Sequence, residues 1–261
     1  MKYLIHIMIT LALMMSHSSM LSHSWAASDP HKAHWSYKGD TGPDHWGDLQ
    51  PDFHQCKEGN KQSPVDISNT KAAAHNLSPI KFSYKESGLK IINNGHTIQV
   101  NYGQGSSITF DGKTYDLLQF HFHSPSEHTS NGKAHNMEAH LVHKNQDGEL
   151  AVVGVFLTKG KQNDFIETLW AHLPEKVGKE EAAENVRIQA AQLLPADQSF
   201  YRYQGSLTTP PCSEGVVWSV METPVEVSEE QISRFTAAIH DNARPVQPLN
   251  ERVIREWQYY H

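Results

Sequence analysis

The sequence predicts a mainly β fold, a single domain with a few short surface helices. Short runs of β-branched and aromatic residues recur along the chain, and turn dipeptides separate them. We find no linker, internal repeat or heptad pattern that would divide the chain. With 261 residues, 38% of them hydrophobic, the chain is long and apolar enough to bury one large core.

Seven runs have the composition of β-strands. They are residues 90–92, 97–102, 107–110, 117–123, 138–143, 151–157 and 216–221. Asn-Gly or Asp-Gly steps at 94–95, 111–112, 131–132 and 147–148 mark turns between them. Two helices are expected, at 164–172 and 228–239. The second has Ser228 as its N-cap and Gln231 three residues later, which is the capping-box pattern.

Residues 1–27 have the pattern of a signal peptide. Lys2 is their only charged residue, residues 3–15 are largely apolar, and the segment ends on Ala26-Ala27. The apolar run of 13 residues is shorter than the roughly 20 that span a membrane, although an uncleaved anchor is the alternative. We therefore expect a mature domain over 28–261, periplasmic or secreted, with no stable membrane span after cleavage.

Cysteine content and charge narrow the class of protein further. Cys56 and Cys212 are the only cysteines, and an even pair in an exported chain predicts a disulfide; two free buried thiols are the alternative.

The formal net charge is −7, and no cluster of Lys and Arg is present. This balance argues against a nucleic-acid partner.

Histidines at alternating positions predict a metal site. On a strand, Gln119, His121 and His123 point to one face, and on the next strand Glu138 and His140 share a face. If the two strands are antiparallel neighbours, three imidazoles can hold one ion and the two polar residues can support them. An incidental His-x-His pair is the alternative, but the paired strand and the two supports favour the metal site.

The other face of the first strand is expected to carry Leu118, Phe120 and Phe122 into the core. His143 lies on the core-facing side of its own strand, so we interpret it as a buried, hydrogen-bonded histidine. His128 is likewise interpreted as structural rather than as a metal ligand.

An ordered set of motifs resembles the α-carbonic anhydrases. The motifs are GPDHW (42–46), QSPVDI (62–67), NGH (94–96), QFHFH (119–123), SEHT (126–129), EAHLVH (138–143), GSLTTPP (205–211) and RPVQP (244–248). They run from about His34 to Arg252. The resemblance implies a large, twisted, mostly antiparallel ten-stranded sheet with zinc at the base of a cone-shaped cleft. It also implies cis peptide bonds before Pro64 and Pro211.

The resemblance implies that His121, His123 and His140 bind Zn²⁺, that Gln119 and Glu138 orient them, and that Asn242 offers a backbone carbonyl to the third imidazole. Carbonic anhydrase is itself the reference case for a three-histidine zinc site with an open fourth position. The match in ligands is therefore not independent evidence for the family. The implied activity is the reversible hydration of carbon dioxide to bicarbonate and a proton by a zinc-bound hydroxide, which makes the protein a carbonate dehydratase.

Further roles follow from the same resemblance. Thr208 accepts the hydroxide proton and donates its own to Glu127, whereas without the resemblance we would interpret Thr208 as a loop residue and Glu127 as a solvated charge. His96 exports the proton, with a plain surface histidine as the alternative. Tyr37, Asn94, Gln99 and Thr209 hold the water chain to His96. The substrate pocket comprises Val142, Val152, Leu207, Thr209, Val216 and Trp218, for which core packing is the alternative.

Three residues depart from the commonest family pattern, namely Gln99, Ser124 and Ala243, and they bear on rate and inhibitor affinity. A cupin-like metal protein is a rival reading, since His121-x-His123-x-x-x-Glu127 fits its first motif, but its preceding glycine and second motif are absent. A non-catalytic binding module on the same fold is the other rival, and a homodimer is compatible with each reading.

Overall fold

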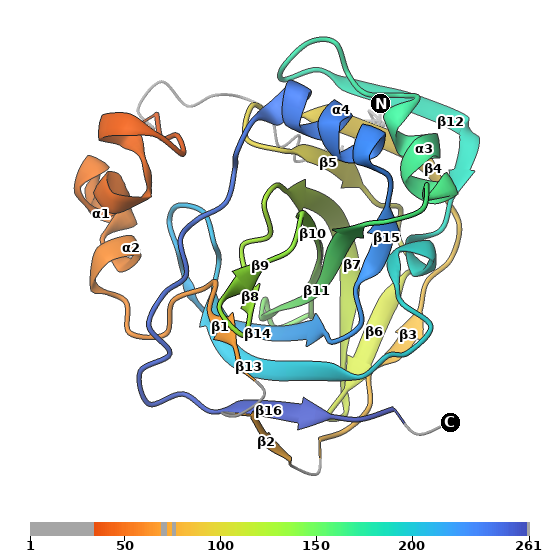
Figure 1. The fold of residues 1–261 in the computed structure, drawn as a ribbon. Helices are drawn as coiled ribbons and strands as arrows, with labels where there is room; N and C mark the ends of the chain where they lie inside the picture. Colours follow the sequence, from red (N-terminus) through yellow and green to blue (C-terminus); the bar gives the residue numbers. More distant parts are fainter. Residues whose placement is uncertain (1–33, 69–71, 75–76, 260–261) are drawn as a thin grey trace, which may run out of the picture. The chain divides into compact units, whose positions relative to one another are not determined.

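A large mixed sheet forms the centre of the fold (Figure 1). The computed structural model describes residues 34–68, 72–74 and 77–259, and within these ranges the sheet has 13 strands. Ten of them follow one another edge to edge, in the order β12 (Glu180–Ile188), β4 (Ser87–Asn93), β5 (Ile98–Asn101), β7 (Lys113–His123), β10 (Met137–Lys144), β11 (Leu150–Lys159), β14 (Glu214–Met221), β13 (Phe200–Ser206), β16 (Ile254–Trp257) and β2 (Ala72–Ala74).

Most pairings along this path are antiparallel, and the exceptions are β11 with β14 and β16 with β2. Three further strands extend the sheet beside the path: β15 (Val225–Val227) pairs with β11, and β3 (Lys81–Ser83) pairs with β6 (Ser107–Phe110), which pairs with β7. A separate small sheet joins β1 (Asp66–Ile67), β8 (Thr129–Ser130) and β9 (Lys133–Ala134). The predicted mainly β fold, with its large and mostly antiparallel sheet, is confirmed. The predicted signal peptide lies outside the described residues.

The helices are short. They are α1 (Trp46–Leu49), α2 (Gln55–Glu58), α3 (Asp164–Trp170) and α4 (Glu229–Ile239), with 3-10 turns at Gly39–Thr41, Pro43–His45, Pro51–Phe53 and Ala190–Leu193. The predicted capping box of α4 is confirmed: the Gln231 N–H donates to Ser228 Oγ, and the Ser228 N–H donates to the Gln231 side chain. Among the described residues, no helix combines the length and the apolar character that crossing a membrane requires.

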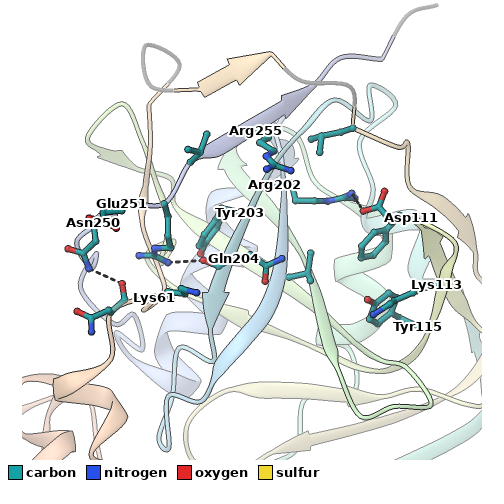
Figure 2. A pocket seen from close by; sticks show the side chains of 16 residues that line it. Lys61, Asp111, Lys113, Tyr115, Arg202, Tyr203, Gln204, Asn250, Glu251 and Arg255 are labelled. Atoms are coloured by element: carbon teal, nitrogen blue, oxygen red, sulfur yellow. Dashed lines mark hydrogen bonds and ion pairs between the residues drawn. The ribbon is translucent and has the colours of Figure 1, made fainter.

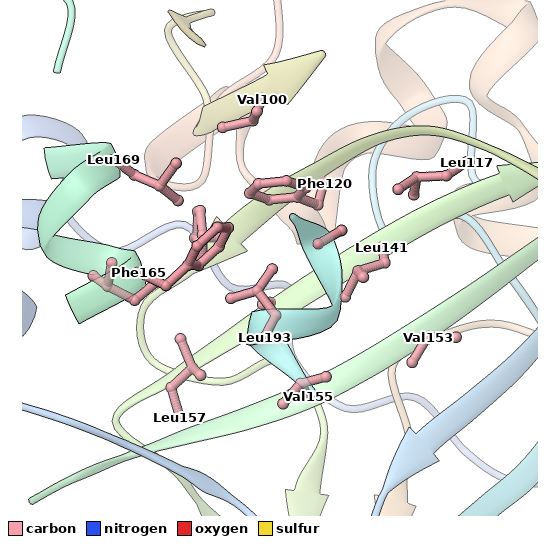
Figure 3. Packing of buried hydrophobic residues seen from close by; sticks show 14 of the residues in the cluster. Val100, Leu117, Phe120, Leu141, Val153, Val155, Leu157, Phe165, Leu169 and Leu193 are labelled. Carbon is pink, nitrogen blue, oxygen red and sulfur yellow. The ribbon is translucent and has the colours of Figure 1, made fainter. Parts of the chain in front are cut away.

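One face of the sheet packs into a large apolar core beneath α3 (Figure 3). Phe120 and Phe122 of β7 lie in this core, as predicted, but Leu118 is 44% exposed. The prediction for Leu118 is wrong because the pairing of β7 with β10 shifts register there. Gln119 pairs with Val142 and Leu117 with His143, so Leu118 has no partner on β10. This bulge exchanges the two faces of the strand, and Leu117 takes the buried position.

The predicted backbone conformation around two prolines is also confirmed. The peptide bonds Ser63–Pro64 and Pro210–Pro211 are cis, and Ser124–Pro125 is a third cis bond that we did not expect.

Candidate metal centre

Strands β7 and β10 bring the three predicted histidines together. The strands are antiparallel neighbours in which His121 pairs directly with His140, and His123 pairs with Glu138. Each histidine presents one ring nitrogen to a common point, and the three nitrogens lie within 4.8 Å of one another. His123 and His140 are each 1% exposed. The arrangement follows from the two-residue period of a strand, which puts His121 and His123 on one face.

Two of the rings are fixed through their Nδ1 atoms. Gln119 Oε1 lies 2.9 Å from His121 Nδ1, and the backbone carbonyl of Asn242 lies 2.8 Å from His123 Nδ1. The resemblance assigned this carbonyl to the third imidazole, and in the structure it faces His123. The Asn242 side chain is anchored beside the same ring: it accepts a hydrogen bond from the Ser124 N–H at 2.8 Å and donates to the Phe122 carbonyl at 3.0 Å.

The third ring is oriented by a buried carboxylate. Glu138 Oε1 lies 3.0 Å from His140 Nε2 and 2.7 Å from His128 Nδ1, while Oε2 accepts the backbone N–H groups of Glu127 and His128. Burial alone would raise the pKa of Glu138, but the two neighbouring imidazoles and their hydrogen bonds hold it well below its usual range. Glu138 is therefore an anion, and its contact with Nε2 leaves His140 Nδ1 facing the other two rings.

The donor set fits zinc. Burial lowers the pKa of His121 well below its ordinary value, lowers that of His123 to about 4, and also lowers that of His140, so all three rings are neutral near pH 7. Neutral imidazole is the form that binds a metal. His123 Nε2 is buried without a hydrogen-bond partner. An orphaned buried nitrogen is costly unless something accepts its lone pair, as a cation would.

Glu127 lies beside the metal-facing nitrogens of His123 and His140. Its Oε1 accepts the backbone N–H of Arg244 at 2.9 Å, and its Oε2 lies 3.5 Å from His123 Nε2. Burial raises the pKa of Glu127 to about 7, while the charge of His140 and hydrogen bonds from Arg244 and Thr208 act in the opposite direction. The structure thus brings the predicted pair of Glu127 and Thr208 together beside the histidines.

A disulfide joins Cys56 to Cys212, as the cysteine pair predicts. Arg244, which sequence reasoning did not single out, ties this bridge to the site. Its guanidinium donates to the carbonyls of Cys56 and Ser63 and to Gln62 Oε1, at 2.8 to 2.9 Å. The RPVQP motif was the available signal. It pointed to a resemblance and carried no indication of which contact the arginine makes.

Two residues predicted for proton transfer, Asn94 and His96, lie on the turn between β4 and β5, and Gln99 of β5 pairs with His121. His96 is half-buried, and its ring stacks on Trp35 with centroids 3.7 Å apart, a partner that we did not predict. Burial lowers the pKa of His96. Asn94 Oδ1 accepts the His96 N–H at 2.9 Å, and Gln99 lies 3.4 Å from the Asn94 amide. Burial, together with the charge of Glu127, raises the pKa of Tyr37 well above its usual value.

The predicted pocket residues form an apolar wall. The Trp218 ring lies 4.8 Å from the His140 ring, centroid to centroid. Trp218 belongs to a buried cluster that also contains Val152 and Val216, with Val142 and Leu207 packed against it. Thr209 is half-buried beside Thr208. Core packing and pocket lining are therefore compatible here, because the cluster both fills the interior and borders the histidines.

Comparison with known proteins identifies the family. Residues 41–258 match the model for eukaryotic-type carbonic anhydrases. A carbonic anhydrase of Nostoc sp. is 45% identical over 227 residues, which is 85% of each chain, and that of Pectobacterium carotovorum is 45% identical over 238 residues, 90% of this chain and 96% of its own.

Solved structures agree with the sequence comparison. An α-carbonic anhydrase from Thermovibrio ammonificans, in complex with the inhibitor sulfanilamide, superposes with a TM-score of 0.84 at 48% identity, covering 86% of this chain and 99% of its own. A hyperthermostable carbonic anhydrase from a hydrothermal vent chimney gives a TM-score of 0.83 at 52% identity, covering 86% of this chain and all of its own. Motifs, fold and relatives agree, and the chain belongs to the α-carbonic anhydrase family of carbonate dehydratases.

Proposed function

We propose that this protein hydrates carbon dioxide reversibly to bicarbonate and a proton, using a zinc ion held by His121, His123 and His140. The observation that carries the proposal is the set of three neutral, converging imidazole nitrogens. Zinc in such a site lowers the pKa of a water to about 7, the value known for carbonic anhydrase itself, and so supplies hydroxide near neutral pH.

Thr208 and Glu127 orient the nucleophile. A hydroxyl that donates its single hydrogen to a carboxylate can act only as a hydrogen-bond acceptor toward any other group. With Glu127 held in place by the Arg244 N–H, the Thr208 hydroxyl would accept a hydrogen bond from the nucleophile and so direct a lone pair of the nucleophile's oxygen at the substrate. Such positioning acts on the rate more than on substrate binding.

The apolar wall suits the substrate. Carbon dioxide carries no net charge and gains little from hydrogen bonding, so a surface of hydrocarbon and indole excludes competing water while leaving the molecule beside the nucleophile. The residues that form this surface are Val142, Val152, Leu207, Val216 and Trp218. Thr209 contributes a hydroxyl at its edge.

His96 carries the released proton away from the site, with Tyr37, Asn94, Gln99 and Thr209 ordering the water between them. Its half-buried ring keeps an imidazole pKa below the ordinary value, which favours rapid release of the proton to solvent. The stack on Trp35 fixes the ring plane at 8° to the indole.

Export through cleavage of residues 1–27, to a periplasm or to the exterior, completes the proposal. The support is the Cys56–Cys212 disulfide, because disulfides persist in oxidising compartments and are rare in the cytosol.

Two matched pairs of variants test the residue roles by stopped-flow hydration of carbon dioxide. Thr208→Ala is expected to lower kcat/KM by about 100-fold, while Thr208→Ser keeps most of it. His96→Ala is expected to lower kcat about tenfold or more at low buffer concentration, and added imidazole restores it, because a diffusing base replaces the lost one. Full activity of Thr208→Ala, or a His96→Ala loss that imidazole leaves unchanged, would contradict these roles.

A further inference from the structure

A hollow lies away from the three histidines, between β13, β14, β16 and the β6–β7 turn (Figure 2). Its volume is 990 Å³, and none of the three histidines lines it. Figure 2 shows Arg202 facing Asp111 at one end, and Lys61 with Asn250 at the other. A hollow of this size is within the range of small-molecule sites. The established family activity gives it no role.

The hollow is cationic although the chain as a whole is anionic. Its lining carries the five cationic side chains Lys61, Lys113, Arg202, Arg252 and Arg255, against the two carboxylates Asp111 and Glu251. Lys113 is already paired with Glu149 at 2.7 Å, and the remaining side chains still leave an excess of positive charge. The whole chain has a formal net charge of −7. A concentration of one sign of charge in a concave site raises the local concentration of the opposite ion.

Arg202 forms a buried cation at one end. The residue is 6% exposed, and its guanidinium lies 4.2 Å from the Phe110 ring centroid and 4.7 Å from that of Phe200. Only Nε has a hydrogen-bond acceptor, Ser219 Oγ at 3.2 Å, whereas Nη1 and Nη2 have none. The Asp111 carboxylate lies 3.6 Å from Nη1, beyond hydrogen-bond distance. Burial lowers the pKa of Arg202 to about 10, so the group stays charged at neutral pH.

A second arginine lies directly opposite the first. Arg255 of β16 pairs in register with Arg202 of β13, so both side chains leave the same face of the sheet. Like charges at directly opposed positions destabilise a strand pair. Within the part of the chain that the structure describes, no carboxylate forms an ion pair with Arg255. Two guanidinium groups on one face of the sheet, each with donors that no protein acceptor occupies, are complementary to an oxyanion, which can accept from both.

We propose that this hollow is a binding site for an oxyanion, a ligand bearing carboxylate or phosphate oxygens, with the Arg202–Arg255 pair as its recognition element. The anion replaces Asp111 at the Arg202 guanidinium. Asp111 can withdraw because its side chain, on the β6–β7 turn, is 58% exposed. Its φ of 49° lies in the left-handed region. Arg252 and Lys61 extend the cationic lining toward the other end, which suits a ligand larger than a single phosphate.

Isothermal titration calorimetry at low ionic strength tests the site, with inorganic phosphate and citrate as separate probes. We expect each anion to bind one site per chain, and the tighter of the two identifies whether phosphate or carboxylate is preferred. Arg255→Gln is expected to weaken binding about tenfold or more, while Lys176→Gln, the same charge change on a distant surface loop, leaves it unchanged. Asp111→Asn is expected to tighten binding, since it removes the competing carboxylate and Asn tolerates positive φ.

Three results would overturn the proposal: no binding of either anion at millimolar concentration, equal weakening by Arg255→Gln and Lys176→Gln, or no tightening by Asp111→Asn. His121→Ala distinguishes anion binding at the metal centre from anion binding in the hollow. The substitution abolishes binding at the metal centre and leaves binding in the hollow intact. Arg202→Lys, which keeps the charge but not the paired donors, serves as a further variant. If it does not fold, the test stands on Arg255 and Asp111.

Discussion

Glu138 Oε1 lies 3.0 Å from His140 Nε2, so a fully buried carboxylate holds the ring whose other nitrogen faces His121 and His123. The same oxygen also contacts His128, and the opposite oxygen accepts two backbone N–H groups. The orientation of His140 is therefore determined by a rigid network rather than by the ring alone.

Replacing Glu138 with Gln is expected to weaken zinc binding by about 10- to 100-fold, the range found when carboxylates behind metal-binding histidines are removed. An amide carries no charge, and the His128 and His140 rings would compete for its single oxygen. Competition with a chromogenic chelator measures the zinc affinity. Gln231→Ala, at a buried amide of α4 outside the metal centre, is a control for general loss of stability. Unchanged zinc affinity in Glu138→Gln would show that the contact is incidental.

Gly154 provides the space that Glu138 occupies. It pairs with His140 across β10 and β11, and a Cβ atom added there would lie 2.9 Å from Glu138 Oε1. Gly154→Ala is therefore expected to displace the carboxylate and weaken zinc binding, although residue 154 touches no metal ligand atom. In a double-mutant cycle the losses from Gly154→Ala and Glu138→Gln should not add, because both act on one contact. Additive losses would mean that Gly154 acts through another route.

The disulfide is expected to contribute about 2–5 kcal/mol to the free energy of unfolding, since it closes a loop of 156 residues. Urea denaturation of Cys56→Ser/Cys212→Ser, compared with the wild-type protein in dithiothreitol, measures the loss. Both samples should unfold at the same urea concentration, which is lower than that for the oxidised wild-type protein. If the double variant unfolds at the same urea concentration as the oxidised wild-type protein, the disulfide does not contribute measurably to the free energy of unfolding.

His143 is expected to make the protein less stable in mild acid. The ring is buried, with Nε2 2.8 Å from the Tyr84 hydroxyl, and burial lowers its pKa to about 3. The unfolded chain binds a proton near pH 6.5 and the folded chain near pH 3, so stability is fully present above pH 6.5 and falls as pH decreases toward 3.

Between pH 6.5 and pH 5 this single group should reduce the free energy of unfolding by about 2 kcal/mol. His143→Gln keeps a polar side chain but does not titrate. Chemical denaturation at several pH values should therefore show a shallower loss for the variant than for the wild-type protein. Parallel pH profiles would show that His143 titrates alike in both states.

Local patterns predicted the strands that carry the site but not their irregularities. The two-residue period of 117–123 placed His121 and His123 on one face, and the assumed antiparallel pairing with 138–143 added His140. The bulge at Leu118 depends on how β7 meets β10, and the Asn242 contact depends on a loop more than a hundred residues away, so neither is encoded locally.

Two further features depend on strand pairing and could not be predicted from local sequence. β12 was not predicted, because its Glu- and Ala-rich sequence has low β propensity and its strand conformation depends on pairing with β4. The Arg202–Arg255 pair likewise follows from the register of β13 with β16, which no single segment specifies. Sequence therefore predicted the chemistry of the metal site better than the contacts that surround it.

Stopped-flow hydration of carbon dioxide by the mature protein tests the central claim most directly, measured with zinc bound, after chelation and after zinc is restored. We expect rapid hydration that disappears with the metal and returns in proportion to the zinc bound, up to one ion per chain. Stoichiometric zinc binding without hydration above the buffer rate would contradict the account, and would make the protein a non-catalytic binding module on the carbonic anhydrase fold.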